Sequence, residues 1–486
     1  MQADSSGQPG NQYVSAPASA GSGGEEADHE PGCVEKDQEG KDPHEHREAF
    51  VVHTDVVAGS LGSRPVAREY FGTDGVRGVV GDFVTVDLVE RLGKASALWS
   101  GGGRVFVGRD TRGSGEELEE AFARGVASAG GVAVLAGVVP TPAVALLRLD
   151  LGVVISASHN PPEYNGVKFF DRTGRKLTDA AEAEIEALLD APAPGGGEIN
   201  RVGIAADSYL QHVRERFGSD LTGLRIAVDC ANGAYAGLAP GAFEELGAEV
   251  QAIGNHPNGS NINVGCGATD LAALQELVVS GGFDLGVAFD GDGDRMLAVD
   301  ELGQTLDGDQ IVAILALHLG VDVVAVTTMT NLGFHKLMEE RGIRVVTTDV
   351  GDRHVLEALY REHGILGGEQ SGHVICLSDH VTGDGLASAL LLCAAVRGGT
   401  LSGAAAVMER YPQVKLNLPR AGRGALPQTL LDRLEEVNAE LNGGGRVLVR
   451  PSGTEPVVRV LAEAETEAEA EALCARIAAL VRQELG

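Results

Sequence analysis

Several features that mark other classes of protein are missing from this sequence of 486 residues. Its six cysteines form no C-x-x-C pair, which argues against a zinc site or a redox motif and indicates small, mostly buried side chains in a reducing compartment. The longest apolar stretch, LASALLLCAAV at 386–396, is too short to span a bilayer and suits a buried helix instead. No basic segment followed by an apolar one opens the chain. We therefore expect a cytoplasmic protein without a secretory signal.

Positive charge is also scarce: 38 Lys and Arg residues face 70 Asp and Glu residues, and the formal net charge is −32. Such an excess of acids repels the phosphates of nucleic acids and anionic membrane surfaces, so we expect neither as a partner. An anionic substrate would have to meet a local cluster of arginines and lysines. The length is too great for one hydrophobic core and suggests roughly three or four domains.

Residues 1–66 carry no sustained apolar pattern and are rich in Gly, Ser, Pro and acids, which predicts a disordered tail. Beyond it, one plan occurs three times: an apolar strand, a polar turn, a helix with apolar residues three and four apart, and a second strand. From about Tyr411, two strands around a polar loop precede an Ala/Glu-rich helix. The pattern predicts an α/β protein of three related α/β domains with mixed sheets and a C-terminal α+β cap. The predicted domains are 67–218, 219–316, 317–410 and 411–486.

Three acids alternate with glycines directly after an apolar strand in FDLGVAFDGDGDR, at Asp290, Asp292 and Asp294. The glycines let the backbone curl so that the three carboxylates face one point, where they would repel one another without a cation. Oxygen-only ligands favour a hard divalent ion, and we predict one Mg²⁺ here. An EF-hand is a weaker alternative, because Arg295 stands where that loop needs a glycine and because a strand, not a helix, comes before it. A plain acidic turn is a further alternative.

A rigid polar turn follows another apolar strand in VVISASHNPPEY at 153–164. A hydrolase nucleophile is one interpretation of its serines, but no G-x-S-x-G elbow occurs in the chain. A serine that carries a phosphoryl group explains the acidic loop as well, since three carboxylates leave a divalent ion short of six ligands and a phosphate oxygen completes the set. An Asn-Pro turn capped by serine hydroxyls is the alternative interpretation.

Two further loops offer groups that bind a phosphorylated sugar. RPSGTEP places Arg450, the hydroxyls of Ser452 and Thr454 and the N–H groups around Gly453 in one turn, a set that grips phosphate. GGEQSGH at 367–373 supplies a carboxylate, a hydroxyl and an imidazole that suit the hydroxyls of a sugar. Either loop, taken alone, also fits an ordinary turn.

These segments, in this order, resemble the α-D-phosphohexomutase family from about Glu69 to the C-terminus, and YFGTDGVRG at 70–78 adds to the resemblance. SASHNP, VGDRHV and GEQSGH are most similar to the family's bacterial branch that acts on glucosamine phosphates. Two features depart from the family's pattern: His354, where a tyrosine is commoner, and the long N-terminal tail. Phosphomannomutase and phosphoglucomutase of the same family are the alternative. A non-catalytic sugar-phosphate sensor would have lost the serine or an acid, and this chain keeps them all.

The resemblance implies four domains around a central cleft and a set of site residues. Ser158 would be the phosphoserine and, through its phosphoryl group, a metal ligand beside Asp290, Asp292 and Asp294. The sugar-reading loop would include Glu369. The remaining residues implied for binding substrate are Ser371 in the same loop and, in the phosphate-binding loop, Arg450, Ser452, Gly453 and Thr454.

The same resemblance implies the reaction. Phosphorylated Ser158 would pass its phosphoryl group to glucosamine 6-phosphate, the resulting 1,6-bisphosphate would turn over in the cleft, and its 6-phosphoryl group would return to the serine. The product, glucosamine 1-phosphate, would feed UDP-N-acetylglucosamine synthesis. Mg²⁺ would neutralise charge on the travelling group, with Arg77 and Arg295 adding positive charge. His159 or Lys168 would exchange the proton of the sugar hydroxyl.

Alternative roles exist for three of these residues: a structural salt bridge for either arginine, and orientation of the loop for His159. We expect glucose or glucosamine 1,6-bisphosphate as the primer, a hexosamine phosphate as the substrate, and a monomer or homodimer. The cap is expected to close and open as the sugar turns over.

Overall fold

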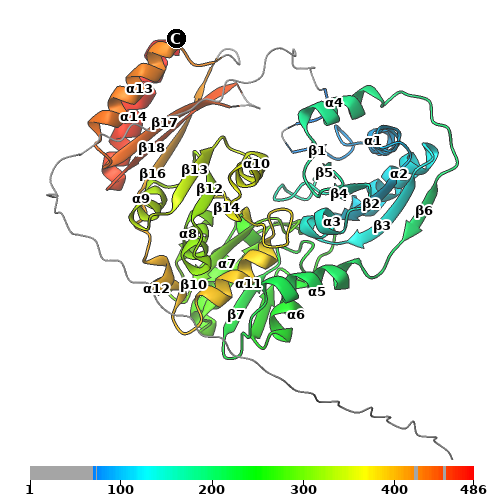
Figure 1. Cartoon of the computed structure of the whole chain (residues 1–486), viewed down its shortest axis with the longest axis horizontal. Helices are drawn as coiled ribbons and strands as arrows, with labels where there is room; N and C mark the ends of the chain where they lie inside the picture. Colours follow the sequence, from blue (N-terminus) through cyan, green and yellow to red (C-terminus); the bar gives the residue numbers. More distant parts are fainter. Residues whose placement is uncertain (1–68, 73, 421–424, 453–455, 486) are drawn as a thin grey trace, which may run out of the picture. The chain divides into compact units, whose positions relative to one another are not determined.

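The computed structural model describes residues 69–72, 74–420, 425–452 and 456–485. The disordered tail predicted for 1–66 therefore lies outside the described residues. Four sheets follow one another along the described chain; the first three mix parallel and antiparallel strands, and the last is wholly antiparallel (Figure 1). This order confirms the predicted fold class of three α/β domains followed by an α+β cap.

The first sheet has six strands in the order β1-β5-β4-β2-β3-β6. Within it β4, β2, β3 and β6 run parallel, and β5 runs antiparallel to both of its neighbours. Successive residues of β2 point to opposite faces, so Val105 and Val107 share a core with α1 and α2, whereas Phe106 shares a core with α3 and α5. The elements are β1 (Val76–Val79), α1 (Val86–Trp99), β2 (Arg104–Arg109), α2 (Gly115–Ser128), β3 (Val132–Val138), α3 (Thr141–Leu147), β4 (Leu151–Ile155), β5 (Tyr164–Phe170), α4 (Asp179–Ala187), β6 (Glu198–Arg201) and α5 (Ala205–Phe217).

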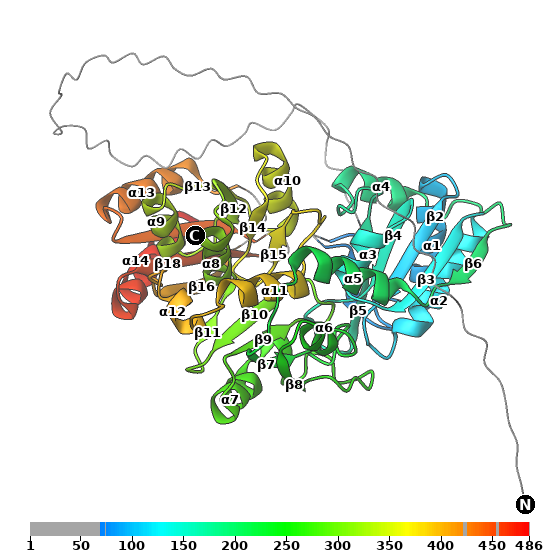
Figure 2. The same ribbon diagram turned by 60° about the horizontal axis from the view of Figure 1, so that its bottom comes forward.

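The second sheet has five strands in the order β11-β10-β9-β7-β8 and is followed most easily in Figure 2. One of its faces packs on α7 through Leu274 and Val278, and the other contributes Val287 and Phe289 to the largest core of the protein. The elements are β7 (Arg225–Asp229), α6 (Ala239–Glu245), β8 (Glu249–Ile253), the 3₁₀ helix η1 (Gly267–Thr269), α7 (Ala272–Gly281), β9 (Leu285–Phe289), β10 (Met296–Asp300) and β11 (Thr305–Leu306).

The third sheet has four strands in the order β13-β12-β14-β15. Its helix α11 covers the apolar run 386–396 and is buried along most of its length, as the sequence predicts. The elements are α8 (Gly308–Leu319), β12 (Val323–Thr327), α9 (Leu332–Glu340), β13 (Arg344–Thr348), α10 (Asp352–Glu362), β14 (Leu366–Gly368), β15 (Val374–Cys376), α11 (Gly385–Ala395) and α12 (Leu401–Ala405).

The cap has three antiparallel strands in the order β16-β18-β17, with two helices and a hydrophobic core of its own. Its elements are β16 (Gln413–Pro419), α13 (Gln428–Glu440), β17 (Gly445–Pro451), β18 (Val457–Ala464) and α14 (Glu467–Leu485).

One hydrophobic core runs through the first three sheets, since Phe106, Val287 and Val326 belong to the same cluster. The predicted borders between the α/β domains therefore stay a prediction, and α8 runs through the one placed at 316. Among the described residues no helix is long and apolar enough to cross a membrane. All five cysteines of the described segments are buried and unbridged, as the sequence predicts.

Candidate active site

Three loops of the candidate site begin where strands end. The serine turn follows β4 after Ile155, the acidic loop follows β9 after Phe289, and the sugar-reading loop follows β14 after Gly368. Each of these strands pairs in parallel with a neighbour, β2, β7 or β12. Ligands of open α/β sheets bind at the carboxyl ends of parallel strands. The placement of the three loops therefore favours a binding site.

The acidic loop turns tightly between β9 and β10. Oδ1 of Asp290 accepts the N–H groups of Gly293 at 3.1 Å and of Arg295 at 3.2 Å. Gly293 has a φ of 77° and lies against the ring of Tyr235, where a Cβ would come within 2.4 Å of a ring carbon. Because the loop joins two strands, it is not an EF-hand, which joins two helices.

The three carboxylates of this loop converge. Their ligand atoms lie within 4.8 Å of one another, and all three side chains are buried. Burial and repulsion from Asp294 raise the pKa of Asp290 well above its ordinary value. Oδ1 of Asp292 and Oδ1 of Asp294 are buried without a hydrogen-bond partner among the described residues. Open anionic oxygens that face one point suit a hard divalent cation, so the residues present fit a metal site.

Ser158 lies against this acidic trio, although the two loops are far apart in the chain. Its Oγ donates to Oδ2 of Asp290 at 2.5 Å, and Nδ1 of His159 is 3.3 Å from the same Oγ. The N–H of Ser158 donates to Oγ of Ser156 at 2.9 Å. Ser156 thus caps the turn, as the interpretation of a turn capped by serine hydroxyls predicts. Ser158 faces the acids, as the interpretation of a serine that carries a phosphoryl group requires.

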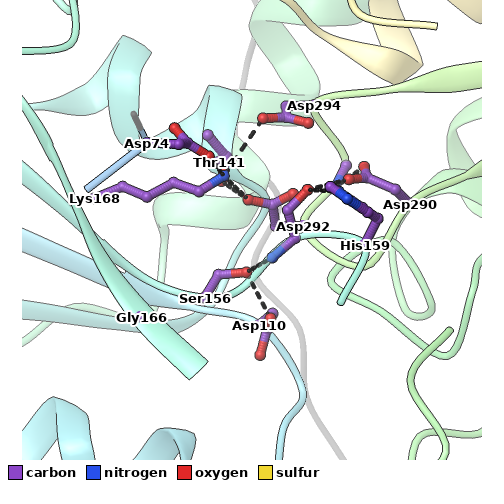
Figure 3. A network of polar contacts seen from close by, with 12 residues as sticks. Asp74, Asp110, Thr141, Ser156, His159, Gly166, Lys168, Asp290, Asp292 and Asp294 are labelled. Carbon is purple, nitrogen blue, oxygen red and sulfur yellow. Dashed lines mark hydrogen bonds and ion pairs between the residues drawn. The ribbon is translucent and has the colours of Figure 1, made fainter. Parts of the chain in front are cut away.

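Lys168 projects from β5 into the same group of acids. Its Nζ is 2.8 Å from Oδ2 of Asp292, 3.4 Å from Asp74 and 3.6 Å from Asp294, and Thr141 donates to Oδ2 of Asp292 at 2.6 Å (Figure 3). Burial alone would lower the pKa of Lys168, but the charges of Asp292 and Asp74 outweigh it and raise the pKa above the ordinary range. The ammonium group is therefore firmly charged.

The pKa of His159 is shifted in the opposite direction to that of Lys168. Burial, and next the charges of Arg295 and Arg77, lower the pKa of His159 to about 4. The imidazole beside Ser158 is therefore neutral near pH 7 and able to accept a proton. Arg77 pairs with Asp74, and Nε of Arg295 lies 3.8 Å from Asp294.

The sugar-reading loop is anchored through its carboxylate. Oε1 of Glu369 accepts the N–H of Gly351 at 3.0 Å, which ties it to the VGDRHV segment. Gly308 packs so closely on this loop that a Cβ would lie 2.0 Å from the carbonyl oxygen of Glu369. Ser371 is exposed, and among the described residues no contact joins it to the acidic trio. His354, the departure from the family's pattern, is half exposed with its Nδ1 4.0 Å from Glu357.

The phosphate-binding loop lies at the end of β17. Arg450 is on that strand, and the N–H of Ser452 donates to the carbonyl of Val457 at 2.9 Å. Two of the residues predicted for this loop, Gly453 and Thr454, lie outside the described residues.

Two charged residues next to the predicted set escaped the sequence analysis. Arg459 pairs with Arg450 across the β17–β18 hairpin, and its Nη2 is 3.4 Å from Oγ of Ser452. Counting residues outward from the hairpin turn would have found it. Burial, and next the charge of Arg459, lower the pKa of Arg450. Asp74 contacts Lys168 as well as Arg77, a position that no local spacing indicates.

Comparison with known protein families covers nearly all of the described chain. Models of the phosphoglucomutase/phosphomannomutase family match four successive stretches: alpha/beta/alpha domain I matches 68–194, domain II 207–303, domain III 307–412 and the C-terminal domain 409–480.

Curated relatives and solved structures agree with these models. The phosphoglucosamine mutases of Pelotomaculum thermopropionicum and Thermobifida fusca are each 47% identical to this chain, covering 85% of it and 99% and 98% of their own lengths. A phosphoglucomutase/phosphomannomutase family protein from Burkholderia thailandensis superposes with a TM-score of 0.73 at 26% identity, covering 86% of this chain and 98% of its own. Aspergillus fumigatus N-acetylphosphoglucosamine mutase, in complex with GlcNAc-6P and magnesium, shares the fold with a TM-score of 0.59 at 20% identity, covering 87% and 97%.

Proposed function

The chain belongs to the phosphoglucomutase/phosphomannomutase family, and from this premise we propose that it interconverts glucosamine 6-phosphate and glucosamine 1-phosphate. Its activity is that of a phosphoglucosamine mutase, an isomerase, as in curated relatives with 44 to 47% identity. The observation that carries the proposal for the site is the 2.5 Å contact between Oγ of Ser158 and Oδ2 of Asp290, inside the buried acidic trio.

Ser158 is the phosphoryl carrier in this proposal. It gives its phosphoryl group to the free hydroxyl of the substrate, and it receives the other phosphoryl group of the 1,6-bisphosphate after that intermediate has turned over. Asp290, Asp292 and Asp294 would hold one Mg²⁺, which neutralises negative charge on the group in transfer. Oδ1 of Asp292 and Oδ1 of Asp294, which are buried without a hydrogen-bond partner among the described residues, support this assignment.

The electrostatic surroundings of His159 and Lys168, the two candidates for proton exchange, favour different roles for them. Neutral His159, next to Oγ of Ser158, accepts the proton of the attacking sugar hydroxyl and returns it in the reverse transfer. Lys168 stays charged among its three acids, so it serves as a fixed positive charge beside the travelling group. Arg295 and Arg77 add to that charge, which an otherwise acidic protein needs at a site for sugar phosphates.

The phosphate that is not in transfer binds to the cap. Arg450 and Ser452, with Gly453 and Thr454, form the loop that grips it, and Arg459 contributes a second guanidinium. Glu369 and Ser371 read the sugar hydroxyls. Because either phosphate of the bisphosphate must fit this one loop, the cap opens and closes during turnover. A 1,6-bisphosphate of glucose or glucosamine primes Ser158.

The first experiment compares the turnover of glucosamine, glucose and mannose phosphates by the full chain with Mg²⁺ and a trace of glucose 1,6-bisphosphate. We expect the highest kcat/KM for the glucosamine phosphates. A preference for mannose or glucose phosphates would instead assign the protein to the phosphomannomutase or phosphoglucomutase activity of the same family.

A second experiment tests the carrier. Ser158→Ala should abolish turnover with every substrate, whereas Ser128→Ala, at the C-terminal end of α2 where the hydroxyl donates to the carbonyl of Gly125, should leave it unchanged. Tryptic mass spectrometry should find the phosphoryl group on Ser158 of the wild type after incubation with glucose 1,6-bisphosphate. Full activity of Ser158→Ala would end the assignment.

A further inference from the structure

A buried arginine holds the serine turn from beneath, and the mechanism above does not use it. The side chain of Arg112 is fully buried. Its guanidinium donates to the carbonyl oxygens of Ser158 and Asn160, both at 2.8 Å, and of Tyr164 at 2.9 Å. It also donates to the carbonyl of Pro161. One guanidinium thus satisfies four backbone carbonyls of the turn that carries the candidate phosphoserine.

A carboxylate completes this arrangement on the other side of the guanidinium. Oδ2 of Asp110 lies 2.9 Å from Nε of Arg112, and both side chains of this ion pair are fully buried. The same oxygen accepts the hydroxyl of Ser156 at 2.6 Å (Figure 3). That hydroxyl accepts the N–H of Ser158 at 2.9 Å. Both the N–H and the carbonyl of Ser158 are therefore tied, directly or through Ser156, to the Arg112–Asp110 pair.

A residue of the second α/β unit holds the turn as well. Nδ2 of Asn263 donates to the carbonyls of Ser158 at 2.9 Å and Asn160 at 3.1 Å, beside the bonds from Arg112. These restraints act on a serine whose φ of 52° is left-handed, a conformation that a non-glycine residue keeps only where its surroundings enforce it. The turn does not hold this shape through its own sequence alone.

We propose that Arg112, paired with Asp110, is a positioning residue for phosphoryl transfer, which fixes the backbone of Ser158 so that its Oγ faces the acidic trio. This inference rests on the proposed function, because it concerns the placement of the same serine. The planar fork of arginine can bond four carbonyls in fixed directions, and a lysine cannot. A serine held in this way returns to one position whether or not it carries a phosphoryl group, and a displacement of about 1 Å at such a centre costs about a hundredfold in rate.

The alternative is that Arg112 serves only the stability of the fold. The contacts distinguish the two roles, because the carbonyls that its guanidinium reaches all belong to the turn at 158–164. Loss of the fork should therefore displace the serine more than it loosens the sheet. Arg109 is the matched control: it lies three residues earlier, and its guanidinium bonds Glu119 and the carbonyl of Asp110, both at 3.3 Å, but no carbonyl of the serine turn.

The test compares Arg112→Lys and Arg109→Lys with the wild type, as full chains with Mg²⁺. We expect Arg112→Lys to lower kcat for glucosamine 6-phosphate by at least about tenfold, while KM changes less than about twofold, because the binding loops are untouched. Arg109→Lys should keep the wild-type kcat. The ³¹P resonance of phosphorylated Ser158, sharp in the wild type and in Arg109→Lys, should broaden or split in Arg112→Lys.

Two further variants keep the test decisive if Arg112→Lys fails to fold. Ser156→Ala removes the acceptor of the Ser158 N–H, and Asn263→Ala removes a donor to its carbonyl; each should lower kcat by several-fold with KM unchanged and broaden the ³¹P resonance. Wild-type kcat and a single sharp resonance in the folded variants would overturn the inference. If the wild type turned over no hexose phosphate and took up no phosphoryl group on Ser158, that result would refute the proposed function itself. A loss of activity confined to raised KM would also count against positioning.

Discussion

The titration of Asp309 leads to a quantitative prediction about stability. Asp309 lies in the first turn of α8 with 1% of its surface exposed, and its Oδ2 accepts the N–H of Asn331 at 2.9 Å. Burial, and next the charge of Asp307, raise the pKa of Asp309 to about 7, and the charge of Glu463 acts in the same direction. The folded protein therefore keeps a proton on Asp309 at pH values where the unfolded chain has lost it.

Two cations lie near the same carboxyl. Lys415 donates to Oε1 of Gln370 at 2.7 Å, and Nε2 of that amide is 3.3 Å from Oδ2 of Asp309. Arg410 pairs with Asp307 at 3.1 Å. The charges of Asp309 and Asp307 act on Lys415, whereas burial is the largest influence on Asp309 and keeps its pKa raised.

The sign of the effect follows from proton linkage. A carboxyl whose pKa is raised by folding from 3.8 to about 7 stabilises the folded state fully below pH 3.8, and this contribution is lost as the pH rises to about 7. At about 1.4 kcal/mol per pKa unit the total loss reaches about 4 kcal/mol, of which about 2–3 kcal/mol falls between pH 5 and pH 8. Asp309→Asn carries no titrating proton. Its stability relative to the wild type should therefore rise by about 2–3 kcal/mol over that interval.

Hydrogen exchange measured by mass spectrometry can check this locally, in peptides from α8 and α9. Comparing wild type and variant at the same pH cancels the intrinsic pH dependence of exchange, so the ratio of protection factors reports the difference in opening free energy. Asp322→Asn, which replaces an exposed acid in the same domain, is the control for the substitution itself. A pH-independent ratio for Asp309→Asn would refute the reasoning, because it would mean that Asp309 is ionised in the folded protein.

Three other perturbations have definite expected outcomes. Burial, and next the charge of Arg446, lower the pKa of His335 to about 4. The contribution of His335 to the stability of the fold is therefore full above pH 6.5 and is lost as the pH falls toward 4. Unfolding curves of His335→Gln should lack about 3 kcal/mol of this acid destabilisation. Gly308→Ala should lower kcat/KM, since its Cβ would push the carbonyl of Glu369 at 2.0 Å, and unchanged kinetics would show that the sugar-reading loop tolerates displacement. Phe243→Ala, in the shared core, should cost about 3–5 kcal/mol of unfolding free energy, which a smaller loss in urea denaturation would contradict.

The acidic loop could be predicted from the sequence because its signal is local. An apolar strand, three acids at alternate positions and two intervening glycines leave few ways to fold, and the structure brings the three carboxylates together as expected. The meeting of Ser158 with Asp290 could be predicted from chemistry, since an incomplete set of metal ligands calls for a phosphoryl group nearby.

Arg112 could not be found in the same way. In GRDTR it looks like any arginine in a polar turn. Apart from Asp110, its partners are backbone carbonyls some fifty positions away, and the sequence carries no signal for such contacts. Lys168 shows a related limit. Its place in β5 marks it as a candidate, but the three acids that keep it charged come from two other loops, so the sequence could not decide between a proton carrier and a fixed charge.

The serine turn and the acidic loop pack closely against each other. A Cβ on Gly291 would lie 2.7 Å from the carbonyl oxygen of Ser158, the oxygen that Asn263 and Arg112 also bind. In the proposed reaction a bisphosphate turns end over end, and we expect the freedom for that motion to lie outside this closely packed centre. The cap has a core of its own and meets the third domain through polar contacts, such as Glu463 with the N–H of Leu332 at 3.0 Å. Opening a polar interface costs little net free energy, because water replaces the lost hydrogen bonds. Opening the shared apolar core of the α/β domains has no such compensation. We therefore expect the motion of turnover in the cap, and a Ser158 that stays in place.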